Sequence, residues 1–261
     1  MTRTLVTFHA HPDDEAIATA GVMAQAAANG HRVVLVVATR GELGEIVPGV
    51  LRDGETLAER RVVEVERAAK ILGASRVAFL DYHDSGMAGE PTNDAPNAFA
   101  AADVDEAAAS LAEILREEGA EVLTVYDENG GYGHPDHIQV HRVGIRAAEL
   151  AGTPRVYQQT IDRDHIRALI AEGRAEIPEG VEVPDPDEMD LGVSADEVTA
   201  RIDVREYVDL KRDAMRAHES QIAPDSFFLQ LPDEQFRESF GYEWFIRAGD
   251  RPPGIETSLW D

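Results

Sequence analysis

The sequence predicts an α/β fold: a doubly wound, mostly parallel, Rossmann-like sheet with helices on both faces and C-terminal elaborations. Short apolar, β-branched runs alternate with segments of helical periodicity through the first 160 residues. Runs such as "RVVLVVAT" (32–39) are continuously apolar, as are parallel strands that are covered on both faces. Strands and helices that alternate in this way form right-handed βαβ units, which build a sheet of this kind.

The predicted elements follow one another in a regular order. Strands are expected at 3–8, 32–39, 76–81, 121–126 and 155–160. Helices are expected at 16–28, 56–72, 103–118, 135–150 and 201–219. The first three of these helices are each followed by a glycine, at Gly30, Gly73 and Gly119, which is a common way for a helix to end.

A chain of this length fits one domain over residues 1–261, with a core at 1–160 and a pocket-shaping part at 161–261. Two long loops, 40–55 and 82–102, follow strands and are expected to carry the binding surface. The acidic, proline-punctuated segment 173–195 is expected to be an excursion or lid.

Composition limits the partners and the location. The chain has 24 Lys and Arg against 50 Asp and Glu, a formal net charge of −26, which repels nucleic acids and anionic membranes. No apolar stretch approaches the roughly 20 residues of a membrane helix. The N-terminus lacks a signal-peptide pattern, so a cytoplasmic location is expected. Because cysteine is absent, any metal must be held by His, Asp or Glu. A homo-oligomer is compatible with these observations.

Two similar motifs, "AHPDDE" (10–15) and "HPDH" (134–137), follow the first and fourth predicted strands. In the common strand order 3-2-1-4-5 these strands are neighbours, and ligands bind where their carboxyl ends flank the switch point. Pro12 and Pro135 each indicate a helix start, since proline is favoured at the first helical position. The two motifs are therefore expected to meet in one crevice.

The residue types in the motifs indicate a catalytic metal site. A catalytic zinc takes three His or carboxylate ligands and leaves one position open. His11, Asp14 and His137 could face one point, which leaves Asp13 to accept a proton from water. His134 is expected opposite, as an imidazolium donor, and the Tyr132 hydroxyl is suited to the same oxyanion.

Other interpretations of the same residues stay open. Two histidines and a carboxylate also describe the non-haem Fe(II) oxygenases, and a non-catalytic sugar- or metal-binding module is a third interpretation. His83 and His218 could line the pocket or have structural roles. His9 could support the site or only end the first strand.

At these motifs the chain resembles the LmbE/PIG-L family of zinc-dependent N-deacetylases. The resemblance implies Zn²⁺, with Fe²⁺ as the alternative in the cell, held by His11, Asp14 and His137. It implies that Asp13 is the general base, that His134 is an acid or electrostatic stabiliser, and that Asp136 tunes His134.

Three further segments, "RVVEVERAAKILG" (61–73), "DSGM" (84–87) and "LKRDAMRAHESQ" (210–221), look like the actinobacterial branch. That branch contains the mycothiol-pathway deacetylase and the mycothiol-conjugate amidase. The likeness places three residues near the substrate: Arg61, Asp84 and Met87. The implied partner is a small N-acetylated molecule of the N-acetylglucosamine type. The implied reaction is hydrolysis of its acetamido group, with the conjugate amidase as the alternative.

Overall fold

The computed structural model describes residues 2–172 and 191–261. Most of the segment expected to be an excursion or lid, 173–190, lies outside the described residues. None of the helices in the described part of the chain combines the length and the apolar character needed to cross a bilayer.

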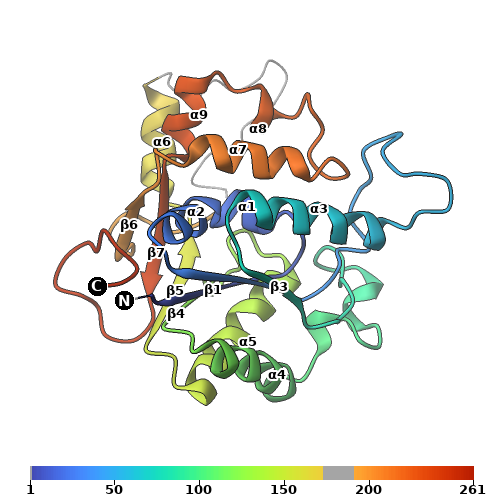
Figure 1. The fold of residues 1–261 in the computed structure, drawn as a ribbon, viewed down its shortest axis with the longest axis horizontal. Helices are drawn as coiled ribbons and strands as arrows, with labels where there is room; N and C mark the ends of the chain where they lie inside the picture. The colour runs from blue at the N-terminus through green and yellow to red at the C-terminus, as the bar shows by residue number, and fades with distance from the viewer. Residues whose placement is uncertain (1, 173–190) are drawn as a thin grey trace.

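The fold is a seven-stranded sheet in the order β3-β2-β1-β4-β5-β7-β6 (Figure 1). Its strands are β1 (Thr4–His9), β2 (Arg32–Val37), β3 (Arg76–Phe79), β4 (Val122–Tyr126), β5 (Arg155–Thr160), β6 (Ala200–Asp203) and β7 (Tyr242–Arg247). The first five are parallel, whereas β7 runs antiparallel to both β5 and β6. The predicted mostly parallel sheet and its order 3-2-1-4-5 are confirmed, and two C-terminal strands extend it.

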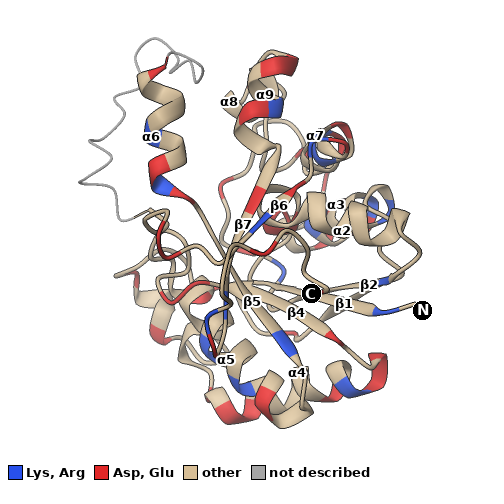
Figure 2. Ribbon diagram, turned by 90° about the vertical axis from the view of Figure 1, so that its left-hand side faces the viewer, with Lys and Arg blue, Asp and Glu red and all other residues tan. Residues whose placement is uncertain are grey.

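Helices cover both faces of the sheet, as predicted (Figure 1). They are α1 (Asp14–Ala18), α2 (Ala20–Ala28), α3 (Leu57–Ile71), α4 (Val104–Glu118), α5 (Pro135–Ala151), α6 (Arg163–Ala171), α7 (Val208–Ala217), α8 (Phe227–Gln230) and α9 (Asp233–Phe240). One apolar core lies between the sheet and α2 and α3 and continues to α7, which packs on those helices. The other lies between the sheet and α4 and α5. Acidic residues are spread over the helices and loops, consistent with the strongly negative net charge (Figure 2).

The structure corrects the helix expected at 201–219. Ala200 and Ile202 are buried while Arg201 and Asp203 are exposed, which is the alternation of a strand. This segment pairs with β7 as β6, and the helix begins only at Val208.

The helix expected at 16–28 is interrupted at Thr19, whose hydroxyl bonds His9 Nε2 at 2.8 Å. A new helix, α2, then begins, and the Glu243 carboxylate accepts the N–H groups of Gly21 and Val22 in its first turn. Pro12 does not begin a helix, because α1 starts at Asp14 with Asp13 as its N-cap. Pro135 is the first residue of α5, as predicted, and His134 caps this helix.

Candidate metal centre and active site

The two His-Pro-Asp motifs meet at the carboxyl ends of β1 and β4, which are paired neighbours in the sheet. The ring of His11 lies 4.8 Å from that of His134 and 5.5 Å from that of His137, measured between centroids. These side chains lie on the wall of a cavity of about 850 Å³. The convergence expected from the strand order is therefore present.

Each of the two candidate histidine ligands has one nitrogen already engaged. His11 Nε2 donates to Asp136 Oδ2 at 3.1 Å, so Nδ1 carries the lone pair of the neutral ring. His137 Nδ1 donates to the carbonyl of Gly130 at 3.1 Å, so its lone pair is on Nε2. That Nε2 atom is buried and has no hydrogen-bond partner among the described residues. Such second contacts fix the orientation of metal-binding histidines in proteins.

The lone pairs converge on the carboxylate of Asp14. His11 Nδ1 lies 3.6 Å from Asp14 Oδ2, and His137 Nε2 lies 3.4 Å from Asp14 Oδ1. Ligands of a tetrahedral zinc at roughly 2.0–2.2 Å would lie about 3.3–3.6 Å apart, which matches both distances. Three acceptor groups that face one another need a positive charge between them, from a proton or from a metal ion. The residues present therefore fit a divalent metal.

The carboxylates around His11 also favour a positive charge at this position. Burial alone would lower the pKa of His11, but hydrogen bonds to Asp136 and Asp84 and the charge of Asp14 raise it to about 10. The position therefore favours a positive charge, which either a proton on Nδ1 or a metal ion can supply.

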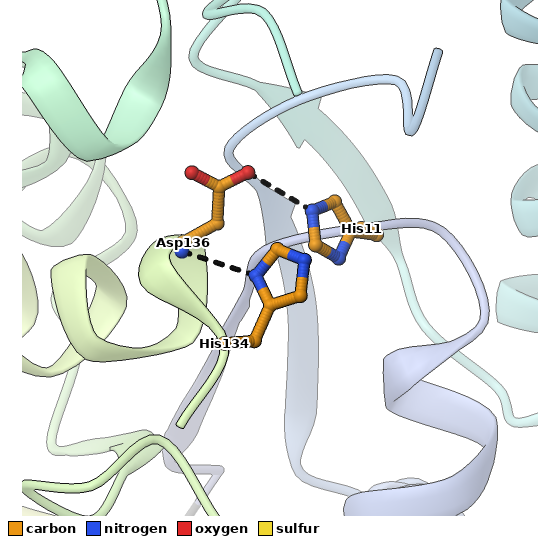
Figure 3. A group of neighbouring side chains, drawn as sticks. All are labelled: His11, His134 and Asp136. Carbon is orange, nitrogen blue, oxygen red and sulfur yellow. Dashed lines mark hydrogen bonds and ion pairs between the residues drawn. The ribbon is translucent and has the colours of Figure 1, made fainter. Parts of the chain in front are cut away.

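A second group of possible ligands, His11, His134 and Asp136, shares His11 with the first and is drawn in Figure 3. His11 Nε2, His134 Nδ1 and the Asp136 carboxylate already have hydrogen-bond partners. The backbone N–H of Asp136 donates to His134 Nδ1 at 3.1 Å, and the Asp136 carboxylate accepts the N–H and the hydroxyl of Ser85. This group therefore supports the ligand His11 and is a poor metal site in itself.

One expectation about His134 is corrected by these contacts. A nitrogen that accepts a backbone N–H cannot be protonated, so the ring is a neutral imidazole with its proton on Nε2, not an imidazolium. Burial, together with the charges of His11 and His137, lowers the pKa of His134 to about 4. The carboxylate of Asp136 bonds His11 and its backbone N–H bonds His134, while the charge of that carboxylate raises the pKa of His134 against the effect of burial. The expected tuning of His134 by Asp136 stays a prediction.

We expect Asp136→Asn to weaken metal binding about 10- to 100-fold, because the supporting carboxylate orients a ligand and raises its basicity. The measurement is metal competition against a chromophoric chelator. Glu64→Gln is the matched control, since it alters a buried carboxylate that bonds Ser220. Equal metal affinities of the two variants would exclude a supporting role for Asp136.

Asp13 has an unusual backbone conformation, with φ 110° and ψ −29°. Its Oδ1 accepts a hydrogen bond of 3.0 Å from Arg61 Nη2. Burial raises the pKa of Asp13, and the charge of Arg61 opposes this shift while that of Asp14 adds to it. A carboxylate with a raised pKa at a cavity wall is suited to accept a proton in a reaction near neutral pH.

The three residues expected near the substrate all lie on the cavity wall, in different settings. Arg61 is buried, and besides Asp13 its guanidinium donates to the carbonyls of Pro12 and Gly41. Asp84 is buried, accepts the N–H groups of Leu43 and Gly86, and lies 3.5 Å from His11 Nε2. Met87 is half-exposed. Their contact with a substrate remains a prediction.

Tyr132 is half-exposed and lines the cavity beside His137, with ring centroids 5.0 Å apart. Burial of the hydroxyl and the nearby Asp14 and Asp13 carboxylates raise the pKa of Tyr132, which keeps it protonated as a donor. The glycines on both sides, Gly131 and Gly133, have positive φ and allow the loop to turn here.

Several residues at the site were not predicted. Tyr126, the last residue of β4, stacks on His137 at 4.3 Å and bonds His9 Nδ1 at 2.8 Å through its hydroxyl. The position of Tyr126 at a strand end, shortly before the second motif, could have indicated that it lies at the site. The apolar part of the cavity wall includes Ile166, Phe227 and Trp244. Local sequence could not predict it, because elements far from the two motifs along the chain supply these side chains.

His83, which the sequence allows either as a pocket residue or in a structural role, is not among the cavity-lining residues. Its side chain is 63% exposed. His218 is fully buried and bonds Glu15, also away from the cavity wall.

Comparisons with known proteins relate this chain to a family of deacetylases. Residues 6–148 match the family described as PIG-L, GlcNAc-PI de-N-acetylase. The chain is 42% identical over 261 residues to a 1D-myo-inositol 2-acetamido-2-deoxy-alpha-D-glucopyranoside deacetylase of Acidothermus cellulolyticus, covering 94% of this chain and 89% of the relative.

Two solved structures show the same fold at low identity. One is the N,N'-diacetylchitobiose deacetylase of Pyrococcus horikoshii, with TM-score 0.61, 18% identity and coverage of 94% of this chain and 83% of that one. The other is GalB, a 4-carboxy-2-hydroxymuconate hydratase from a Pseudomonas, with TM-score 0.62, 17% identity and coverage of 96% and 98%. Because a hydratase and a deacetylase share this fold, the fold alone does not determine the reaction.

Proposed function

The chain belongs to the PIG-L family, and from that premise we propose that it is a metal-dependent amidohydrolase that removes the acetyl group of an N-acetylglucosamine-type sugar. The relative that is 42% identical is named as a deacetylase of an inositol acetamido-glucopyranoside, and we propose a substrate of that class for this chain. The observation that carries the proposal is the unpartnered, buried Nε2 of His137 facing Asp14, with the carboxylate of Asp13 beside it.

We propose Zn²⁺ as the metal, held by His11, Asp14 and His137, with Fe²⁺ as the alternative. Two imidazoles and one carboxylate are a usual ligand set for catalytic zinc. When bound, such an ion would polarise a carbonyl and lower the pKa of a bound water to about 7.

The protein's own groups move the protons. Among the hydrogen bonds of the described residues, Asp13 uses only Oδ1, for Arg61, so Oδ2 is the atom proposed to take the proton of the attacking water. His134 Nε2–H and the Tyr132 hydroxyl are proposed to donate to the oxyanion that develops on the acetyl carbonyl. The proton held by Asp13 can then pass to the leaving amine.

The C-terminal part, 161–261, is proposed to shape the substrate end of the cavity within one domain. Its contribution to the wall is largely apolar: Ile161, Ile166, Leu169, Ile170, Leu191, Phe227, Phe228, Phe240 and Trp244. A sugar joined to inositol is polar throughout, so these side chains favour, as a second candidate function, amide hydrolysis of a conjugate with an apolar group. The Fe(II) oxygenase and the binding module have less support, because the carboxylate of Asp13, beside the three proposed ligands, suits hydrolysis.

The test is to incubate the metal-loaded protein with the N-acetylglucosaminyl-inositol, with N,N'-diacetylchitobiose and with a mycothiol conjugate, and to measure freed primary amine. We expect release from the inositol glycoside, lost on chelation and restored by Zn²⁺. Release from the conjugate alone would favour the amidase. No amine from any of the three, at full metal occupancy, would contradict the proposed function.

A further inference from the structure

The backbone of Asp13 is held in a conformation that few non-glycine residues adopt. With φ at 110°, it lies in the left-handed region, where such residues cost about 1–3 kcal/mol unless their surroundings hold them. Only two other described non-glycine residues have positive φ, Asp81 and Asn97. Contacts from the surrounding residues must therefore hold the backbone of Asp13 in this conformation.

Glu15 supplies one of these contacts from within the motif. Its Oε2 accepts the backbone N–H of Asp13 at 3.0 Å, although it is only two residues further along the chain. The side chain of Glu15 is fully buried. A buried carboxylate needs further partners, because burying an unpaired charge is costly.

His218 is the second partner of Glu15 and comes from a distant part of the chain. Its Nε2 bonds Glu15 Oε1 at 2.6 Å, and both side chains are completely buried. His218 caps the C-terminus of α7, and its carbonyl accepts the N–H groups of Gln221 and Ile222. Since α7 packs on α1, α2 and α3, the turn at His218 is a rigid support.

We propose that Glu15 and His218 are positioning residues for Asp13: His218 fixes Glu15, and Glu15 fixes the peptide that aims the Asp13 carboxylate into the cavity. The inference rests on the proposed role of Asp13 as the base. Arg61 fixes the carboxylate itself, through Oδ1, so the backbone and the side chain of Asp13 are held by separate groups.

The same contacts predict which kinetic quantity changes. The metal ligand Asp14 is held independently, because its Oδ2 accepts the backbone N–H of His11 at 2.8 Å. Neither Glu15 nor His218 lines the cavity. Loss of the pair should therefore lower kcat and leave both KM and metal content unchanged.

The experiment compares His218→Leu, His218→Gln and Glu15→Gln with a control, Tyr157→Phe. Tyr157→Phe removes the hydrogen bond that the Tyr157 hydroxyl donates to Glu256. Neither residue lines the cavity. A misplacement of about 1 Å can cost about 100-fold in rate, so we expect His218→Leu to lower kcat about 10- to 100-fold. His218→Gln should restore most of it, because the glutamine amide can donate as Nε2 does. Glu15→Gln should also lower kcat, since one amide oxygen replaces the two acceptors that Asp13 and His218 use.

The deciding measurement repeats His218→Leu and Glu15→Gln in an Asp13→Asn background. If the pair acts through Asp13, neither change lowers the residual kcat further, whereas a general structural defect multiplies with it. Multiplied losses, or lost metal, would overturn the inference. If His218→Leu does not fold, Glu15→Gln alone decides between these outcomes. Full activity of Asp13→Asn by itself would instead refute the proposed role of Asp13 as the base, on which this inference rests, and would leave the amidohydrolase proposal standing.

Discussion

Replacing Asp13 by asparagine is expected to lower kcat about 10²- to 10⁴-fold, the usual contribution of a general base. Asparagine keeps the size of the side chain, can still accept the hydrogen bond from Arg61, and tolerates positive φ as aspartate does. It cannot take a proton from water near neutral pH. The measurement is steady-state release of amine from the metal-loaded variant.

The metal content of Asp13→Asn provides the control. Because Asp13 is not a member of the proposed ligand set, the variant should bind the same amount of zinc as the parent. A parent-like kcat would remove Asp13 from the mechanism. Loss of zinc would mean that Asp13 acts as a ligand.

His137→Ala is expected to lose both the metal and the activity. The change removes one of three ligands and leaves His11 and Asp14, too few for a catalytic zinc site. The ion contributes several kcal/mol to the reaction, so the rate should fall on the order of 10³-fold or more. Elemental analysis after dialysis measures the metal, and amine release measures the rate.

His83→Ala is the matched histidine control, because the structure places this exposed side chain away from the cavity wall. It should keep both zinc and turnover. A His137→Ala protein that retains one zinc per chain after dialysis would remove His137 from the ligand set.

The sequence was sufficient to predict the sheet order and the meeting of the two motifs. Both depend on local patterns: the apolar runs of the parallel strands and the proline that begins α5. The ligand trio His11, Asp14 and His137 follows from the same patterns and from the residue types of metal ligands. Its binding of a metal remains a proposal.

Contacts between distant segments explain what the sequence did not predict. The sequence predicts a helix over 201–219, whereas Ala200–Asp203 forms strand β6. A strand of only four residues is defined mainly by its pairing, here with β7, which local sequence does not reveal. The conformation of Asp13 depends on Arg61, and on His218 through Glu15. The neutral state of His134 depends on a hydrogen bond from its own helix, which the residue types alone do not reveal.

The most direct test is a crystal structure of the zinc-loaded protein with anomalous data at the zinc edge. The account predicts one peak bounded by His11 Nδ1, the Asp14 carboxylate and His137 Nε2, with Asp136 still bonded to His11 Nε2. A peak bound instead by His11, His134 and Asp136, or no peak after loading, would contradict it.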